Sequence, residues 1–385
     1  MAADGARGSS VCVVGAGPAG IAAAAMLRRA GAHVVVLERA DVGASWVARY
    51  DCLHLHTVRW LSGLPGYGIP RSSGKWPSRD RVVDYLRAYA ARNALAVRVG
   101  VDVSRIDRDD GRWLVRATGD EVAADRVVVA TGYSNVPFVP GWPGMFGGTI
   151  VHSSAYRNPE PFRNRRVLVV GGGNSGAEIA ADLAAGGAAD VLLSVRTPPA
   201  IVRRDTAGVP TQLLGIASAH LPVRVVDRIA STLRRVAFPD LGPLGLPAPE
   251  RPYSEFLRRR VIPVIDVGIV SAVSSGRVRV VADVARLDDT VVELADGSRA
   301  MVDTIIAATG FRTGLEPLVG HLRVLDERGV PLVHAPAAPP GAPGLHFVGY
   351  DVTLGGMLRV IGGQARRLAR TVAADVPGSG PGPSP

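Results

Sequence analysis

The segment VCVVGAGPAGIAAAAMLRRAGAHVVVLER, residues 11–39, is the strongest indication of the fold of this chain. It begins with a β-branched run typical of a buried parallel strand. It continues through a glycine turn into an alanine-rich helix and ends in a second β-branched strand. The sequence RVLVVGGGNSGAEIAADLAAGGAADVLLSVR, residues 166–196, repeats this order. Each copy predicts a strand–helix–strand unit of roughly 30 residues, so we expect an α/β fold built on two such units.

The first copy has the spacing of a dinucleotide-binding loop. Gly15, Gly17 and Gly20 form GxGxxG directly after a strand and before a helix. These glycines allow a tight turn, a close approach of a pyrophosphate and close packing of helix on strand. The free N–H groups at the helix start favour phosphate. Glu38 ends the second strand, and its carboxylate suits ribose hydroxyls but repels a 2′-phosphate. The first unit therefore predicts FAD or NAD rather than NADP.

The second copy predicts a different nucleotide. Its turn contains three glycines and two polar residues: Gly171, Gly173, Asn174, Ser175 and Gly176. The residue 18 places after Gly176 is Ser194, and Arg196 follows shortly after it. A serine and a guanidinium in place of the acid suit a 2′-phosphate, so this unit favours NADPH over NADH. Arg203 and Arg204 are further candidates for the same phosphate.

Two near copies of a strand ending in Ala-Thr-Gly flank the second unit. They are DRVVVATGY, residues 125–133, and DTIIAATGF, residues 303–311. We interpret them as crossings between two Rossmann-like domains, the NADPH domain being inserted into the FAD domain. The predicted parts are residues 8–160 and 291–375 for the FAD domain, 161–290 for the NADPH domain and 376–385 for a disordered tail. Two consecutive domains are the alternative.

Composition excludes several classes. The 385 residues are 47% hydrophobic and 20% charged, which is typical of a globular chain with an ample core. The net charge of +10 comes from scattered arginines, so we do not expect nucleic-acid binding. The sequence contains no uninterrupted apolar run of about 18 residues, so it predicts no membrane-spanning helix, and we expect a cytoplasmic protein. Cys12 and Cys52 form no CxxC pair, which argues against a disulfide reductase.

Between the two units lies a third motif, FGGTIVHSSAYRNPEP at residues 146–161. It fits the pattern FxGxxxHxxx(Y/F)(K/R)xxx(P/D) that identifies class B flavin-containing monooxygenases, and the chain resembles this family over residues 10–372. The matching positions are Phe146, Gly148, His152, Tyr156, Arg157 and Pro161. Related Baeyer–Villiger enzymes carry Trp at the position of Tyr156. Within the family the chain is most similar to YUCCA enzymes and their bacterial relatives, through residues 50–70 and the segment IPVIDVG.

The resemblance implies a catalytic cycle. NADPH reduces FAD, the reduced flavin forms a C4a-(hydro)peroxyflavin with O2, and one oxygen atom passes to a small organic substrate. That substrate is a soft nitrogen or sulfur nucleophile or an arylpyruvate-type keto acid, and the YUCCA likeness favours the keto acid. Soft nucleophiles need the hydroperoxide and keto acids need the peroxide, a choice that the sequence leaves open. The alternatives are an NADPH oxidase releasing H2O2, a Baeyer–Villiger oxygenase and a non-enzymatic flavin-bound sensor.

The resemblance also implies site residues. For FAD we expect Gly15, Gly17, Pro18, Ala19, Gly20, Glu38, Arg39, Trp46, His56, Val103, Ala130, Thr131, Gly132, Gly349 and Tyr350. For NADPH we expect Gly171, Gly173, Asn174, Ser175, Gly176, Ser194, Arg196, Thr309 and Gly310. His56 is the one catalytic candidate, with a purely structural role as the alternative. We expect His152 to orient the interdomain linker near NADPH. His54 and His56 lack a third ligand, so no metal is predicted.

The segment between residues 220 and 240 predicts an amphipathic helix. Val225, Ile229, Leu233 and Val236 share one stripe, opposed by arginines. We expect this helix to pack on the domain and do not expect membrane contact; a lid over the substrate cavity and a basic face touching an anionic membrane are the alternatives. The sequence also leaves the oligomeric state open.

Overall fold

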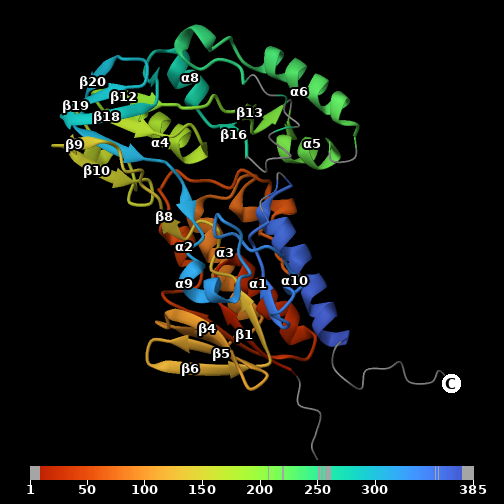
Figure 1. Cartoon of the computed structure of the whole chain (residues 1–385). Coiled ribbons are helices and arrows are strands. Elements are labelled where there is room, and N and C mark those ends of the chain that lie inside the picture. Colours follow the sequence, from red (N-terminus) through yellow and green to blue (C-terminus); the bar gives the residue numbers. More distant parts are fainter. Residues whose placement is uncertain are drawn as a thin grey trace, which may run out of the picture.

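The computed structural model describes residues 9–206, 208–218, 221–249, 252, 255, 262–351, 353 and 355–374. Figure 1 shows two lobes, the lower one containing both the first and the last helices of the chain and the upper one its middle. Each lobe contains a five-stranded sheet in which every neighbouring pair is parallel. The predicted tail, residues 376–385, and His220 lie outside the described residues.

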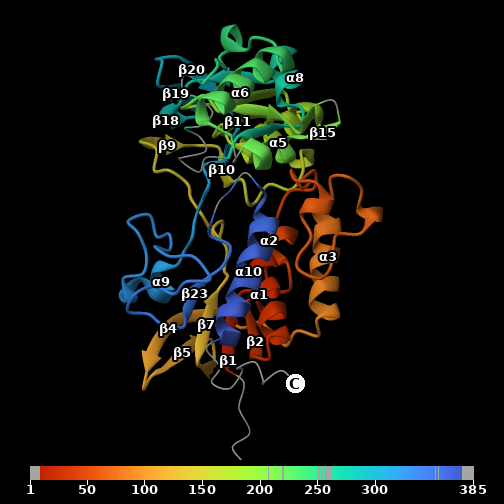
Figure 2. The ribbon, with the colours of Figure 1, turned by 90° about the vertical axis from the view of Figure 1, so that its right-hand side faces the viewer.

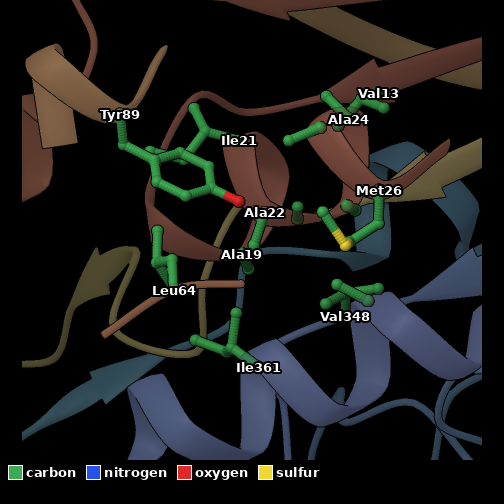
Figure 3. Packing of buried hydrophobic residues seen from close by; sticks show 14 of the residues in the cluster. Val13, Ala19, Ile21, Ala22, Ala24, Met26, Leu64, Tyr89, Val348 and Ile361 are labelled. Carbon is green, nitrogen blue, oxygen red and sulfur yellow. The ribbon is translucent and has the colours of Figure 1, made fainter. Parts of the chain in front are cut away.

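The lower sheet has the order β23-β7-β1-β2-β3. Its strands are β1 (Ser10–Val14), β2 (His33–Glu38), β3 (Val97–Val99), β7 (Arg126–Val129) and β23 (Leu345–Phe347). Helix α1 (Pro18–Arg29) lies beside α10 (Met357–Ala374), with α3 (Arg79–Arg92) next to it (Figure 2). The small side chains of α1 let the two helices approach closely, and Figure 3 shows Ala19 and Ala22 among larger residues such as Ile361. The alanine-rich helix of the sequence is therefore the buried centre of this lobe.

The upper sheet has a similar parallel arrangement in the order β10-β21-β11-β12-β17, but its outer strand β10 precedes the glycine loop in the chain, whereas β23 of the lower sheet comes last. Its strands are β10 (Thr149–His152), β11 (Arg166–Val170), β12 (Asp190–Ser194), β17 (Arg279–Val281) and β21 (Thr304–Ala307). Helices α4 (Asn174–Ala185) and α8 (Ile269–Ser274) pack in its core. Because β10 and β21 pair within this sheet, the upper lobe extends beyond the predicted limits of 161 and 290 on both sides.

Two short strands join the lobes. Strand β8 (Val136–Pro137) follows the first Ala-Thr-Gly, and β22 (Phe311–Arg312) follows the second. They pair antiparallel, as one outgoing and one returning chain must, and β8 lies between the lobes in Figure 1. Since the chain crosses directly after each Ala-Thr-Gly, the carboxyl edges of both sheets face the boundary between the lobes.

The remaining elements cover these sheets. The lower lobe adds α2 (Ala44–Val47), α9 (Glu316–Val319), β4 (Val103–Asp109), β5 (Arg112–Ala117) and β6 (Asp120–Ala124). The upper lobe adds β9 (Gly144–Phe146), β13 (Ile201–Arg203), β14 (Asp205–Thr206), β15 (Val209–Pro210), β16 (Val264–Asp266), β18 (Val284–Asp289), β19 (Val291–Leu294) and β20 (Arg299–Met301). Short 3-10 helices occupy Arg59–Leu61, Arg71–Ser73, Glu160–Phe162, Gly242–Leu244 and Gly320–Leu322.

The amphipathic helix forms as α6 (Val223–Ala237), next to α5 (Thr211–Ser218). Within this helix Val226 is buried, whereas the side chains of Val225 and Ile229 are 42% and 47% exposed. The first residues of the predicted apolar stripe therefore face solvent. The helix packs on the domain through a neighbouring face, the one that contains Val226. The side chains of Leu233 and Val236 lie outside the described residues. Among the helices described, none is long and apolar enough to cross a bilayer.

Candidate functional site

The first glycine loop forms a cradle between β1 and α1. Gly15 has a φ of +102°, and a Cβ there would lie 2.7 Å from the carbonyl oxygen of Ala130. A Cβ at Gly20 would lie 1.8 Å from the oxygen of Gly15, so helix and loop can touch only through glycine. At Gly17, in contrast, a Cβ would meet nothing within 4 Å. The space left open at Gly17 fits a pyrophosphate against an α1 start that no described side chain caps.

The lower sheet brings the other expected FAD residues to the same edge. Ala130, Thr131 and Gly132 follow β7, next to β1, where the strand order reverses. Thr131 Oγ1 is 2.8 Å from the hydroxyl of Tyr350, which follows β23. Burial raises the pKa of Tyr350 to about 12, so the phenol stays protonated. Gly349 lies beside α1, where a Cβ would be 2.8 Å from that of Ala19.

Glu38 anchors the loop as well as facing the expected ribose. Its carboxylate accepts the N–H of Ala16 at 2.6 Å and that of Ala40 at 3.0 Å. A carboxylate has about four acceptor positions, so two remain for ribose hydroxyls. Nearby, the exposed Arg39 donates to Asn135 at 2.8 Å. Of the remaining expected FAD residues, Val103 is half-buried at the start of β4, and Trp46 is half-buried on α2, packed against the α1 core.

The second loop repeats the cradle. A Cβ at Gly171 would lie 2.4 Å from the oxygen of Ala308, and one at Gly176 would lie 1.8 Å from the oxygen of Gly171. Gly173 again borders open space within 4 Å. Thr309 and Gly310 follow β21 as Thr131 and Gly132 follow β7. The second cradle therefore fits a pyrophosphate as the first does.

Strand pairing corrects the position that replaces the ribose acid. Val14 pairs with Leu37 in the first unit, but Val170 pairs with Ser194 in the second. Counting 18 residues from the last glycine is therefore off by one, because the turn between α4 and β12 is one residue longer. Val195 occupies the place of Glu38, and Arg196 that of Arg39.

Two of the expected NADPH side chains bond to the protein itself. Ser194 is 1% exposed and donates its hydroxyl to the carbonyl of Ala282. Asn174 donates to the carbonyl of Pro263 and accepts the N–H of Ile265. Ser175 is half-buried and lies near Tyr50. Arg196 is exposed and makes no hydrogen bond or ion pair with any described residue. Of the polar side chains predicted for this loop and strand end, Arg196 is the one left facing solvent.

The two further arginines have other surroundings. Arg203 is exposed on β13 and lies over the ring of Phe238 at 5.6 Å. Arg204 is half-buried and lies over Trp76 at 5.3 Å. Burial lowers the pKa of Arg204.

His56 lies at the boundary between the lobes. Its Nε2 is 2.9 Å from Oε1 of Glu178, which is buried on α4 of the other lobe. The next residues continue this boundary, since Val58 N–H donates to Gln212 of α5 at 3.0 Å. His54 instead contacts the carbonyl of Cys52. Sequence reasoning missed Glu178, although GNSGAE places an acid one turn into the nucleotide-binding helix.

His152 is the last residue of β10, and its side chain contacts the segment by which the chain returns from the upper to the lower lobe. Its Nδ1 accepts the N–H of Ser154 at 3.1 Å, so Nε2 is left to donate to the carbonyl of Gly310 at 2.9 Å. The ring meets Phe311 edge-on, with 4.8 Å between the ring centres. These contacts tie the end of the upper sheet to the segment that leaves it for the lower lobe.

His152 should make the stability of the protein sensitive to acid. Burial lowers its pKa below the ordinary value of 6.5. The unfolded chain therefore takes up the proton at higher pH than the folded one, so stability is kept above about pH 6.5 and lost as the pH falls below it. In thermal unfolding from pH 8 to pH 5, the wild type should lose more stability than His152→Gln. Parallel pH profiles for the two proteins would contradict this role.

The two cysteines do not form a redox pair. Cys12 is buried in β1, Cys52 lies in the boundary segment, and both are free thiols. Burial raises the pKa of each to about 12, which keeps them protonated and unreactive.

Comparison with known proteins agrees with this geometry. A family model described as pyridine nucleotide-disulphide oxidoreductase matches residues 12–207. The indole-3-pyruvate monooxygenase YUCCA1 of Oryza sativa subsp. japonica is 38% identical over 88% of this chain and 86% of its own length. The solved flavin-containing monooxygenase of Stenotrophomonas maltophilia is 27% identical, with a TM-score of 0.72, and the match covers 96% of this chain and 99% of that one. OTEMO, solved in complex with FAD and NADP, shares the fold with a TM-score of 0.72 at 18% identity, over 96% of this chain and 85% of its own.

The rice relative covers 88% of this chain, and the residues that the family model matches include both glycine loops and the motif between them. The chain therefore belongs to the YUCCA-type flavin-containing monooxygenases, oxidoreductases that use FAD and NADPH.

Proposed function

We propose that the lower lobe holds FAD, that the upper lobe is an inserted domain that holds NADPH, and that the enzyme oxygenates an arylpyruvate-type keto acid. The pair of matching cradles carries this proposal. Both cradles leave open space at the middle glycine, and both lie at carboxyl edges that face the lobe boundary. Only the first has an acid at the strand end, and only the second has a free arginine there. That difference supports FAD in the first and NADPH in the second.

The cofactors supply the redox chemistry: NADPH provides the hydride, and reduced FAD activates O2. The protein provides orientation and protection from water at the boundary. Residues 48–58 of the lower lobe close part of this boundary. Asp51 N–H donates to the carbonyl of Arg157 at 2.8 Å, and Arg157 donates to the carbonyl of Ala48 at 2.6 Å. These contacts join the lower lobe to the motif between the two nucleotide units.

The substrate class rests on the relatives. As a flavin monooxygenase the enzyme acts on a small molecule and O2, and the rice relative is named for indole-3-pyruvate. We therefore propose an aromatic keto acid as substrate ahead of amines and thioethers. Turnover with 18O2 and NADPH should place one labelled atom in the product of an arylpyruvate. Label in an amine or thioether product, and none in the keto-acid product, would reverse this order.

The same experiment separates the other functions. If the enzyme releases one mole of hydrogen peroxide for each mole of NADPH consumed, whether or not a candidate substrate is present, it is an oxidase. A flavin that NADPH fails to bleach under anaerobic conditions would indicate a flavin-bound binding protein.

Glu38→Ala should lower the affinity for FAD by about 10- to 100-fold. The change removes the acceptor for the ribose and also releases the N–H groups of Ala16 and Ala40. Lost charge-assisted hydrogen bonds cost about 1.5–3 kcal/mol each, part of which water restores. Flavin retention after gel filtration at defined dilution measures the effect, and Glu160→Gln on the surface of the other lobe is the control. Full flavin content in the Glu38 variant would contradict the proposed ribose contact.

A further inference from the structure

A buried carboxylate lies where the two lobes meet. Glu178 is 4% exposed and stands one turn into α4, directly after the second glycine loop. Its Oε1 is 2.9 Å from Nε2 of His56 in the lower lobe. The two atoms lie within ion-pair distance, but the contact does not meet the geometry of a hydrogen bond, and Oε1 has no hydrogen-bond partner among the described residues. Because burying a carboxylate is costly without compensating partners, its neighbours indicate what it does.

The neighbours of Glu178 come from both lobes. Tyr50 of the lower lobe lies near enough to interact with it, and burial raises the pKa of Tyr50 well above its usual range, so the phenol stays protonated. Arg204 of the upper lobe lies near enough to interact electrostatically with it. Glu178 therefore has a phenol of the lower lobe and the positive charge of Arg204 among its neighbours.

The two ring nitrogens of His56 have different surroundings, since Nε2 faces the carboxylate of Glu178. Its Nδ1 is buried and has no hydrogen-bond partner in the described part of the chain. With the proton on Nε2, the ring donates toward Glu178 and leaves a lone pair at Nδ1. With the proton on Nδ1, a buried N–H would be unpaired and Nε2 would face the carboxylate as a second acceptor. Since unpaired buried N–H groups are rarer than under-used acceptors, the geometry favours the Nε2–H form.

On the proposed function above, we propose that Glu178 is a positioning residue for the monooxygenase. From the NADPH-binding lobe it holds His56 of the FAD-binding lobe as the Nε2–H tautomer. Nδ1 is then an oriented acceptor at the boundary where the cofactors and substrate meet. A carboxylate that fixes the tautomer of a functional histidine acts in the same way in other sites. Docking of the two lobes thereby sets the hydrogen-bonding state of His56.

The tautomer can be measured without turnover. Long-range 1H–15N spectra of the FAD-loaded protein labelled with 15N-histidine report protonation at each ring nitrogen, and His56→Gln assigns the His56 signals. The wild type should show a protonated Nε2 and a bare Nδ1 at neutral pH. Glu178→Gln keeps a carbonyl acceptor and should keep this tautomer, whereas Glu178→Met, of similar size, should change or mix it. The wild-type tautomer in the methionine variant would overturn the proposal.

A double-mutant cycle tests whether Glu178 acts through His56. Glu178→Met and His56→Gln should each lower product formed per NADPH by roughly 10-fold or more, as loss of the outer carboxylate does elsewhere. The double variant should be no worse than His56→Gln alone, while Glu160→Gln should match the wild type. Additive losses would overturn the proposal, as the carboxylate would then act independently. If no substrate is oxygenated by the wild type, the proposed function fails, but the spectra still decide the tautomer.

Discussion

Replacing Gly17 with valine is expected to yield a folded chain that retains almost no FAD. The backbone at Gly17 is extended, with φ −73° and ψ −178°, which valine adopts without strain. Its side chain would enter the open space above the start of α1, where the pyrophosphate is proposed to lie. Flavin absorbance per protein should fall to near zero. The melting temperature should stay close to that of wild-type apoprotein.

Gly173→Val is the matched variant in the other lobe. It should keep the flavin yet lose its reduction by NADPH, because Gly173 borders the equivalent open space. Gly20→Ala gives the contrasting outcome, since its Cβ would lie 1.8 Å from the carbonyl oxygen of Gly15 and so destabilise the lobe itself. If Gly17→Val retained flavin at the wild-type level, the first cradle would not be the FAD site.

Arg196→Ala is expected to raise the KM for NADPH by about 100-fold while changing that for NADH little. A bidentate guanidinium–phosphate contact contributes about 3 kcal/mol to the binding free energy, which corresponds to about a 100-fold change in affinity. Arg196 suits this role because it is exposed at the end of β12 and makes no contact with a described residue that would compete. Anaerobic flavin reduction by each nucleotide measures the preference directly.

Arg286→Ala is the control for general loss of positive charge. Arg286 is exposed on β18 in the same lobe and is not a candidate for the 2′-phosphate. An equal loss of NADPH preference in both variants would show that net charge, rather than a 2′-phosphate contact, controls the choice. An unchanged preference in Arg196→Ala would move the phosphate elsewhere.

The positions of the strands and helices of both nucleotide units follow from the sequence. Residues 11–39 and 166–196 form the predicted strand, turn and helix, since β-branched runs, GxGxxG spacing and alanine-rich helices are local features. The segments that follow each Ala-Thr-Gly pair with one another as β8 and β22, and the inserted-domain arrangement stays a prediction. The motif between the units identified the family for the same reason, because its spacing is contained in one short segment.

The family, the cofactors and the two strand–glycine loop–helix units could therefore be predicted from the amino-acid pattern. Three other features depended on how distant segments pack. Strand register, which depends on turn length, moved the equivalent of Glu38 from Ser194 to Val195. Parallel pairing of distant strands assigned β10 and β21 to the upper sheet. Packing of the lobes brought His56 to Glu178 across 122 positions of chain (178 − 56), a contact between segments that share no local pattern.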